Sequence, residues 1–265
     1  MLLQDKVAVI TGGASGIGEI TAKEFAKKGV KVSLCDINQK ELERVVDEII
    51  ASGGEALGTV ANITKEEEIV NLMEKTVNRF GSINIVFANA GIISDGVMIN
   101  TDKATNKVKS VMSTEQFQKV LDINLTGTFL TLREGARKMV DNNWPGVLII
   151  TSSINKVGQV GQLNYASTKA AVALWPKILA GEFQMKGIQH IRIAGIAPGY
   201  TGTPILKNMD QNALNSILSD VHIGRLIEPE EIASSIIHIA ENDAIDATTI
   251  EVTGGVLFGS RNIAK

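Results

Sequence analysis

The arrangement of apolar residues constrains the fold of this chain more than any other feature of its sequence. Short apolar runs rich in Val, Ile and Leu alternate with longer segments whose apolar residues recur at helical spacing. The predicted strands are Val7–Ile10, Val30–Leu34, Leu57–Val60, Ile83–Ala88, Val147–Ile150, Ile191–Ile196 and Thr249–Val252. The predicted helices are Glu19–Lys28, Gln39–Ala51, Lys65–Phe80, Glu115–Val140, Ala166–Met185 and Pro229–Glu241. Because several strands are apolar on both faces, the alternation predicts an α/β fold: a single doubly wound Rossmann domain over residues 1–265, with a mostly parallel seven-stranded sheet and helices on both faces.

Local signals refine this pattern. Asn38 and Thr64 are predicted N-caps of the helices that follow them, and Pro229 suits a first helical turn. Pro176 falls inside a predicted helix, which we expect it to bend or loosen. Ile92–Ser113 is long for a strand-to-helix connection, so it is expected to form local structure of its own or to lie over a site.

Composition removes several classes of function. The net charge of −3 gives no electrostatic basis for binding nucleic acid or anionic lipid, and no apolar stretch approaches the roughly 18 residues that span a membrane. The only cysteine, Cys35, excludes an internal disulfide, and the three histidines lack metal-ligand spacing. We therefore expect a soluble, cytoplasmic protein with no bound metal.

A glycine-rich loop follows the first predicted strand. It reads Thr-Gly-Gly-Ala-Ser-Gly-Ile-Gly, and Gly12, Gly16 and Gly18 allow a diphosphate to approach the backbone and the start of the next helix. Asp36 ends the second strand 18 residues after Gly18, where a carboxylate accepts hydrogens from both hydroxyls of an adenosine ribose and repels a 2′-phosphate. No Arg or Lys lies in the loop or within two residues of Asp36. The pattern predicts NAD(H) rather than NADP(H).

Tyr165 and Lys169 form a second chemical motif. They lie four residues apart on a predicted helix and therefore share a face. An ammonium close to a phenol favours the phenolate, so the pair is expected to lower the pKa of Tyr165 from about 10 and to let it exchange a proton near neutral pH.

These motifs, in this order, resemble the short-chain dehydrogenases/reductases over nearly the whole chain. The resemblance rests on the Gly12–Gly18 loop, Asn89-Ala90-Gly91, Asn124, a serine after the fifth strand, Tyr165 to Lys169, Pro198-Gly199, Thr203 and Gly224–Ile232. It implies a cofactor bound by Gly12, Ser15, Gly16, Ile17, Gly18, Asp36, Asn62, Ile63, Asn89, Ala90, Gly91, Tyr165, Lys169, Pro198, Gly199, Thr201 and Thr203.

The resemblance also implies the roles of a catalytic tetrad. Tyr165 donates a proton to the carbonyl oxygen in reduction and removes it in oxidation, while Lys169 holds the nicotinamide ribose. A serine hydrogen-bonds the substrate oxygen, Asn124 positions a water in a proton relay, and the hydride comes from the cofactor. Asn62 replaces the aspartate that the family often has near the adenine, and its side-chain oxygen is expected to accept one hydrogen bond there.

Two neighbouring serines are candidates for the serine of the tetrad. Ser153 lies seven residues after Gly146, the usual place in the family, whereas the common separation of 13 residues before Tyr165 selects Ser152. An insertion fits more easily into the loop after the serines than into a buried strand, which favours Ser153. Neighbouring strand residues point to opposite faces, so only one of the two reaches the substrate.

The resemblance implies an oxidoreductase that transfers a hydride between NAD(H) and a secondary alcohol or ketone. Bacterial 3-oxoacyl-thioester reductases are the nearest functional match, through Gly224–Ile232 and the Tyr165 region. An NADPH-dependent 3-oxoacyl-acyl-carrier-protein reductase of fatty acid synthesis is an alternative, although Asp36 disfavours NADPH. A catabolic 3-hydroxyacyl, hydroxysteroid or sugar-alcohol dehydrogenase suits NAD better. A catalytically silent NAD-binding scaffold is a further alternative, which the complete tetrad disfavours.

The resemblance has two consequences for assembly and motion. It implies a homotetramer, with Glu115–Val140 and Ala166–Met185 packed across one interface and the C-terminal strand region across another. It also implies that Thr201–Asp210 is a mobile lid over substrate and nicotinamide.

Overall fold

A computed structural model describes residues 1–203, 206 and 210–256 of the chain. Its main sheet has seven parallel strands in the order β3-β2-β1-β4-β7-β8-β9. These strands are β1 (Val7–Thr11), β2 (Lys31–Asp36), β3 (Ala56–Val60), β4 (Ile85–Ala88), β7 (Gly146–Thr151), β8 (Ile191–Pro198) and β9 (Thr248–Val252). Each corresponds to a predicted strand, so the doubly wound α/β prediction is confirmed.

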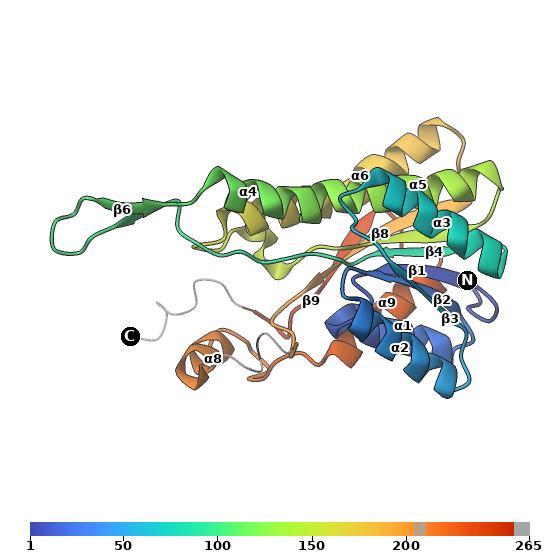
Figure 1. Cartoon of the computed structure of the whole chain (residues 1–265), viewed down its shortest axis with the longest axis horizontal. Coiled ribbons are helices and arrows are strands. Elements are labelled where there is room, and N and C mark those ends of the chain that lie inside the picture. The colour runs from blue at the N-terminus through green and yellow to red at the C-terminus, as the bar shows by residue number, and fades with distance from the viewer. Residues whose placement is uncertain (204–205, 207–209, 257–265) are drawn as a thin grey trace.

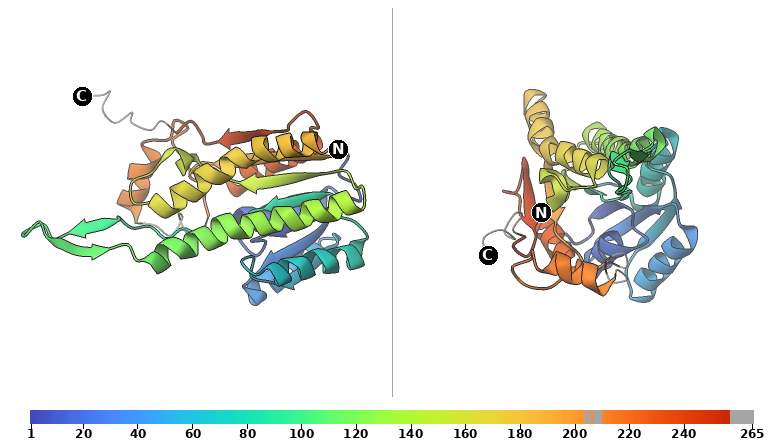
Figure 2. Two further views of the ribbon diagram at one scale, coloured as in Figure 1. Left: turned by 90° about the horizontal axis from the view of Figure 1, so that it is seen from above. Right: turned by 90° about the vertical axis from the view of Figure 1, so that its left-hand side faces the viewer.

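Helices cover both faces of this sheet (Figures 1 and 2). On one face lie α1 (Gly16–Lys27), α2 (Gln39–Ala51) and α9 (Pro229–Glu241). On the other lie α3 (Glu66–Phe80), α5 (Thr128–Asp141) and α6 (Leu163–Met185). Each layer buries its own cluster of aliphatic side chains against the sheet, including Phe25 and Val45 on one face and Leu72 and Met139 on the other. Burial on both faces explains why the inner strands β1, β4 and β7 have apolar rather than alternating sequences.

The predicted helix Glu115–Val140 is three elements in the structure. α4 (Thr114–Leu121) passes into a π-helical turn, η1 (Asp122–Gly127), and then into α5. Asn124 lies within the π-helical turn and is completely buried. Its side chain accepts a hydrogen bond from the backbone N of Ile92 (2.8 Å) and donates one to the Ile92 carbonyl (2.9 Å). Turns of this kind often mark functional positions, because they re-aim one side chain without ending the helix.

Two of the three predicted helix starts are correct. The side chain of Asn38 caps α2 by accepting a hydrogen bond from the backbone N of Glu41, and Pro229 opens α9. Thr64 is not an N-cap, because both its backbone N and its hydroxyl donate to the side-chain oxygen of Asn62, and Lys65 occupies the capping position.

Pro176 lies buried within α6, and the helix runs through it without interruption. No helix in the described part of the chain is both long and apolar enough to cross a membrane.

The segment after β4 forms local structure, as predicted. β5 (Ile99–Thr101) pairs antiparallel with β6 (Val108–Val111) in a separate hairpin that projects away from the start of α4 (Figures 1 and 2). Apolar side chains along it are exposed, including Ile99, Val108 and Val111. The backbone N of Met112 donates to the carbonyl of Met98 (3.0 Å), so the two ends of the hairpin meet where it leaves the body. A short η2 turn (Ile154–Val157) and helix α8 (Gln211–Leu218) complete the described elements.

Candidate active site

The glycine loop turns tightly between β1 and α1 at the carboxyl edge of the sheet. Gly12 has a φ of +65°, and a Cβ there would lie 2.9 Å from the Cα of Ala90. A Cβ at Gly18 would overlap the carbonyl oxygen of Gly12. At Gly16, by contrast, a Cβ would meet only the methyl group of Thr203, at 3.5 Å. The loop is therefore tightly packed at Gly12 and Gly18, whereas there is room between Gly16 and Thr203. This room fits a diphosphate against the first turn of α1.

Asn89 fixes this loop to the neighbouring strands. Its side-chain nitrogen donates to the carbonyls of Thr11 and Gly12 (3.2 Å each), and its oxygen accepts from the hydroxyl of Thr151 (3.3 Å). The backbone N atoms of Asn89 and Ala90 donate to the hydroxyl of Thr11. Both ends of the Asn89 amide are therefore used to hold β1, β4 and β7 in register around the loop.

Asp36 lies beside the glycine loop at the end of β2. Its carboxylate accepts hydrogen bonds from the backbone N of Ala14 (3.2 Å) and of Asn38 (3.0 Å). A cation that sequence reasoning missed approaches the same place: Arg44 of α2 has a guanidinium N 3.5 Å from the Ala14 carbonyl. Because Arg44 is paired with Glu19, Glu41 and Glu48, its charge is already compensated. No local motif signals Arg44, since it reaches the loop from the middle of α2, which follows β2 in the sequence.

Asn62 does not offer the acceptor that the sequence predicted. Its side-chain oxygen is occupied by the backbone N and the hydroxyl of Thr64, at 3.0 and 2.9 Å. Its backbone N donates to Glu68 (2.7 Å). The neighbouring Ile63 is buried, and its side chain packs against the backbone of Gly127 in η1.

Tyr165, Lys169 and Ser153 converge at the ends of β7 and α6. The ammonium N of Lys169 lies 5.7 Å from the centre of the Tyr165 ring and donates to the carbonyl of Thr151 (2.8 Å). Ser153 hydrogen-bonds the Tyr165 side chain. The arrangement places a phenol between a hydroxyl and an amine, which suits proton exchange with a substrate oxygen.

The direction of the Tyr165 pKa differs from the sequence-based expectation. Burial raises the pKa of Tyr165, the hydrogen bond with Ser153 opposes that rise, and the negative charge of Asp95 adds to it. Burial also lowers the pKa of Lys169 to about 8. The prediction of a lowered Tyr165 pKa is therefore wrong for the protein alone: desolvation dominates, and the ammonium is directed toward Thr151 rather than the phenol oxygen.

The structure separates the two candidate serines. The hydroxyl of Ser152 is buried and donates to the backbone carbonyl of Lys169 (2.7 Å), so it holds β7 against α6. The hydroxyl of Ser153 accepts a hydrogen bond from the backbone N of Asn155 (3.1 Å) and meets Tyr165. Of the two, Ser153 is the one beside the phenol.

Asn124 and Lys169 approach each other across the backbone of Gly91. A Cβ at Gly91 would lie 3.1 Å from the side-chain oxygen of Asn124 and 3.5 Å from the ammonium N of Lys169. The Asn124 amide also lies 3.4 Å from the hydroxyl of Thr168. The structure therefore brings together all four residues of the predicted tetrad.

The remaining predicted contacts lie along the end of β8. Pro198 ends that strand, and the backbone N of Gly199 donates to the carbonyl of Val252 (2.9 Å). Thr201 is buried, and Thr203 faces Gly16 across the glycine loop. Of the predicted lid, positions 204–205 and 207–209 lie outside the described residues.

Neither the Cys35 thiol nor a metal site provides a further catalytic group among the described residues. Burial raises the pKa of the Cys35 thiol to about 12, which makes it a poor nucleophile. Within the described ranges, no group of three or more His, Cys, Asp or Glu side chains is placed to hold a metal ion.

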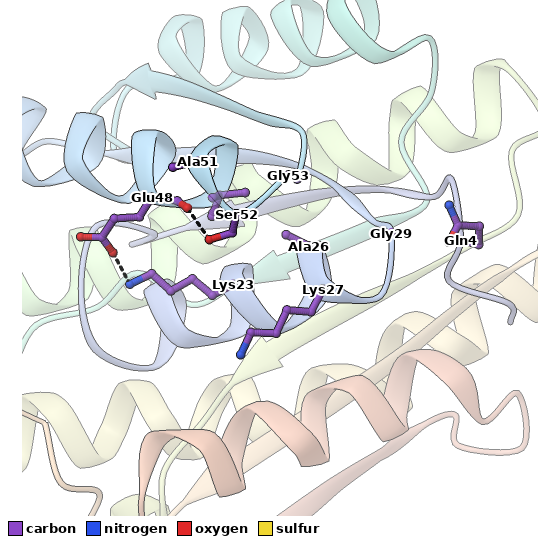
Figure 3. Close-up of a pocket in the computed structure, with 11 residues that line it drawn as sticks. Gln4, Lys23, Ala26, Lys27, Gly29, Glu48, Ala51, Ser52 and Gly53 are labelled. Carbon is purple, nitrogen blue, oxygen red and sulfur yellow. Dashed lines mark hydrogen bonds and ion pairs between the residues drawn. The ribbon is translucent and has the colours of Figure 1, made fainter.

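A groove of about 630 Å³ lies away from this site, beside α1, α2 and the amino ends of the first three strands (Figure 3). Its Lys23 pairs with Glu19 and Glu48 (2.6 Å each), and its Lys27 pairs with Glu24. These charges are already compensated, so the groove offers no anion site.

Comparison with known proteins finds relatives that match nearly the whole chain. The model of the short chain dehydrogenase family matches residues 6–214. The 3-oxoacyl-[acyl-carrier-protein] reductase FabG of Thermotoga maritima is 31% identical over 264 residues, covering 97% of this chain and 100% of that protein. The 2,5-dichloro-2,5-cyclohexadiene-1,4-diol dehydrogenase LinX of Sphingobium indicum is 32% identical, covering 97% of this chain and 98% of that protein. A solved 7α-hydroxysteroid dehydrogenase in complex with NADH and 7-oxo glycochenodeoxycholic acid superposes with a TM-score of 0.86 at 28% identity, covering 96% of this chain and 95% of that one.

Proposed function

Because this chain belongs to the short-chain dehydrogenase family, we propose that it interconverts a secondary alcohol and a ketone at Ser153 and Tyr165, with a nicotinamide cofactor on the glycine loop. The observation that carries the proposal is the meeting of Ser153, Tyr165 and Lys169, of which the serine and the lysine are buried and the tyrosine is partly exposed. The cofactor, when bound, supplies or accepts the hydride. We propose that residues 1–265 form one domain around this site.

Residues of the protein hydrogen-bond the substrate oxygen and exchange a proton with it. The backbone N of Asn155 occupies an acceptor position of the Ser153 hydroxyl, so the Ser153 proton is available to hydrogen-bond the substrate oxygen or Tyr165. Tyr165 donates its proton to that oxygen in reduction and takes one from it in oxidation. Lys169 lies over the phenol ring and, with a pKa near 8, gains or loses a proton near neutral pH. Asn124 orders the backbone that separates it from Lys169.

The preferred cofactor is NAD(H). The backbone N atoms of Ala14 and Asn38 hold the carboxylate of Asp36 beside the glycine loop, where it would bind ribose hydroxyls and repel a 2′-phosphate. Arg44, the nearest cation from α2, is engaged by three carboxylates and is not available to that phosphate. The solved 7α-hydroxysteroid dehydrogenase, which contains NADH, supports the same choice of cofactor.

The proposed substrate class is a 3-oxoacyl or 3-hydroxyacyl thioester. Its support is the similarity to 3-oxoacyl-[acyl-carrier-protein] reductases over nearly the whole chain. A hydroxysteroid or cyclic diol is the second candidate, because relatives of similar identity and coverage are named for such substrates.

The testing experiment compares initial rates of NADH and NADPH oxidation with acetoacetyl-CoA. We expect NADH to be oxidised at least about tenfold faster at subsaturating cofactor, since one buried or well-placed charge contact changes affinity by that order. The two rates are followed by absorbance at equal cofactor concentrations.

An Asp36→Ser variant serves as the cofactor control. Losing the carboxylate should reduce the preference for NADH without altering kcat for the ketone. Faster oxidation of NADPH by the wild-type protein would contradict the assignment of Asp36. Absence of turnover with acetoacetyl-CoA, but turnover of a hydroxysteroid or polyol with NAD⁺, would select the second substrate class.

We further propose a cytoplasmic homotetramer. Exposed apolar side chains on α5 and α6, namely Phe129, Leu174, Ile178 and Met185, support association through these helices. Light scattering at micromolar concentration is expected to give a mass close to four times 28.3 kDa. A monomeric mass would contradict the proposed assembly.

A further inference from the structure

The base of the β5–β6 hairpin is tied to the loop that carries the reactive residues. The side chain of Gln116 in α4 donates to the carbonyls of Ser94 and Asp95 (3.1 Å each). The side chain of Asn164, next to Tyr165, donates to the same Ser94 carbonyl (3.0 Å). The backbone N of Gly96 donates to the carbonyl of Gly161 (2.8 Å). Residues 94–96 are therefore a fixed part of the wall around Tyr165.

Asp95 begins a directed chain of side-chain hydrogen bonds. A carboxylate only accepts, so it fixes the Gln162 amide with its nitrogen toward Asp95 (3.0 Å) and its oxygen toward Asn155. The Asn155 nitrogen donates to that oxygen (2.8 Å). One charged group thus determines the orientation of two buried amides.

The chain ends at the hydroxyl beside Tyr165. Asn155 is held through its side chain by Gln162, and its backbone N donates to the Ser153 hydroxyl (3.1 Å). We propose that Asp95 is a positioning residue, which acts through Gln162 and Asn155 to hold the Ser153 hydroxyl in place for the reaction. This inference rests on the proposed function and assigns a role to the base of the hairpin segment.

One buried atom of this chain of hydrogen bonds has no partner in the part of the protein that the structure describes. The orientation imposed by Asp95 leaves the side-chain oxygen of Asn155 buried without a hydrogen-bond partner among the described residues. A buried acceptor without a partner destabilises the folded state.

Asp95 also acts on Tyr165 through its charge. Among the described residues, two charged groups act near the phenol: Lys169, on its own helix, lies 5.7 Å from the ring centre, and Asp95, from the segment after β4, acts on it through its charge. The negative charge of Asp95 opposes the phenolate and so raises the pKa of Tyr165. Removal of this charge should allow the phenolate to form at lower pH.

The experiment measures kcat, KM and the pH profile of alcohol oxidation for Asp95→Ala and Asp95→Asn. The substrate is whichever of 3-hydroxybutyryl-CoA, cholic acid and sorbitol the wild-type protein oxidises fastest with NAD⁺. Asp95→Ala is expected to lower kcat about tenfold, since a small misplacement of a reacting group has effects of this order or larger. KM for NAD⁺ should not change. Asp95→Asn keeps an acceptor for Gln162 and should recover kcat to within about threefold at its own optimum. Both variants should reach half-maximal rate at lower pH.

Asp102→Ala is the matched control, since it removes a carboxylate from the exposed hairpin turn seven positions later. Its kcat and pH profile should match those of the wild-type protein. A kcat for Asp95→Ala within twofold of wild type overturns the positioning role while the proposed function stands. Failure of Asp95→Asn to recover kcat, with no shift in its profile, also overturns it. A wild-type protein that oxidises none of the substrates overturns the proposed function and this inference together.

Discussion

Replacement of Tyr165 by phenylalanine is expected to reduce turnover by about a hundredfold to ten-thousandfold, the range over which a positioned proton donor accelerates a reaction. The change removes one hydroxyl, and the ring that lies near Lys169 is kept. NADH affinity is expected to stay within about twofold, because the glycine loop and Asp36 are unaltered. Initial rates and a titration of NADH fluorescence measure the two quantities on the same preparation.

The Tyr165→Phe variant also distinguishes the proposed enzyme from a catalytically silent NAD-binding scaffold. A protein that only binds NAD would lose nothing when this hydroxyl is removed. Turnover at the wild-type rate would therefore refute the proposed role of Tyr165, whereas loss of both turnover and NADH binding would indicate damage to the fold.

Replacement of Lys169 by methionine is expected to change activity and stability in opposite directions. Activity should fall at least about a hundredfold, because the amine beside the phenol is lost. At pH 7, however, the free energy of unfolding should rise by about 1–3 kcal/mol, because a buried amine with a pKa of about 8 must otherwise be held protonated in an apolar site.

The pH dependence has a definite sign. The folded-state pKa of Lys169 is about 8, below the value of about 10.4 for an unfolded chain. Between these values the unfolded state binds more protons, so Lys169 makes the wild-type protein gain stability as pH rises. The stability advantage of Lys169→Met should therefore be largest at pH 7 and should vanish near pH 10.

Urea denaturation at pH 7 and pH 10 measures this difference. Lys177→Met is the matched control, since Lys177 is exposed on the same helix and should show neither effect. A Lys169→Met protein that is less stable than wild type at pH 7 would show that the hydrogen bond to Thr151 outweighs the desolvation of the ammonium.

The sequence predicted the sheet and most helices because their signals are local and repeated. Strands buried on both faces must be apolar throughout, and the amphipathic α2 and α9 match their predicted bounds. The spacing of four residues indicated Tyr165 and Lys169, and the family resemblance indicated Asn124.

What the sequence did not predict depends on contacts between distant segments. The π-helical turn around Asn124 is coupled to Ile92, 32 residues away, and no periodicity signals it. Thr64 suits an N-cap, yet it binds Asn62 instead. The rise in the Tyr165 pKa depends on burial and on Asp95, neither of which is visible from a spacing of four residues. The choice between Ser152 and Ser153 likewise required the partners of each hydroxyl.

The β5–β6 hairpin leaves and rejoins the body at Met98 and Met112, which are joined by one backbone hydrogen bond. A hairpin whose ends lie this close together can change in length or composition without altering the order of the sheet strands. Residues 94–96 lie just before this junction, and their contacts with α4 and the candidate active-site loop involve no residue of the hairpin strands. The hairpin is thus an appendage whose two strands lie outside the main sheet, while residues 94–96 belong to the contacts around the candidate active site.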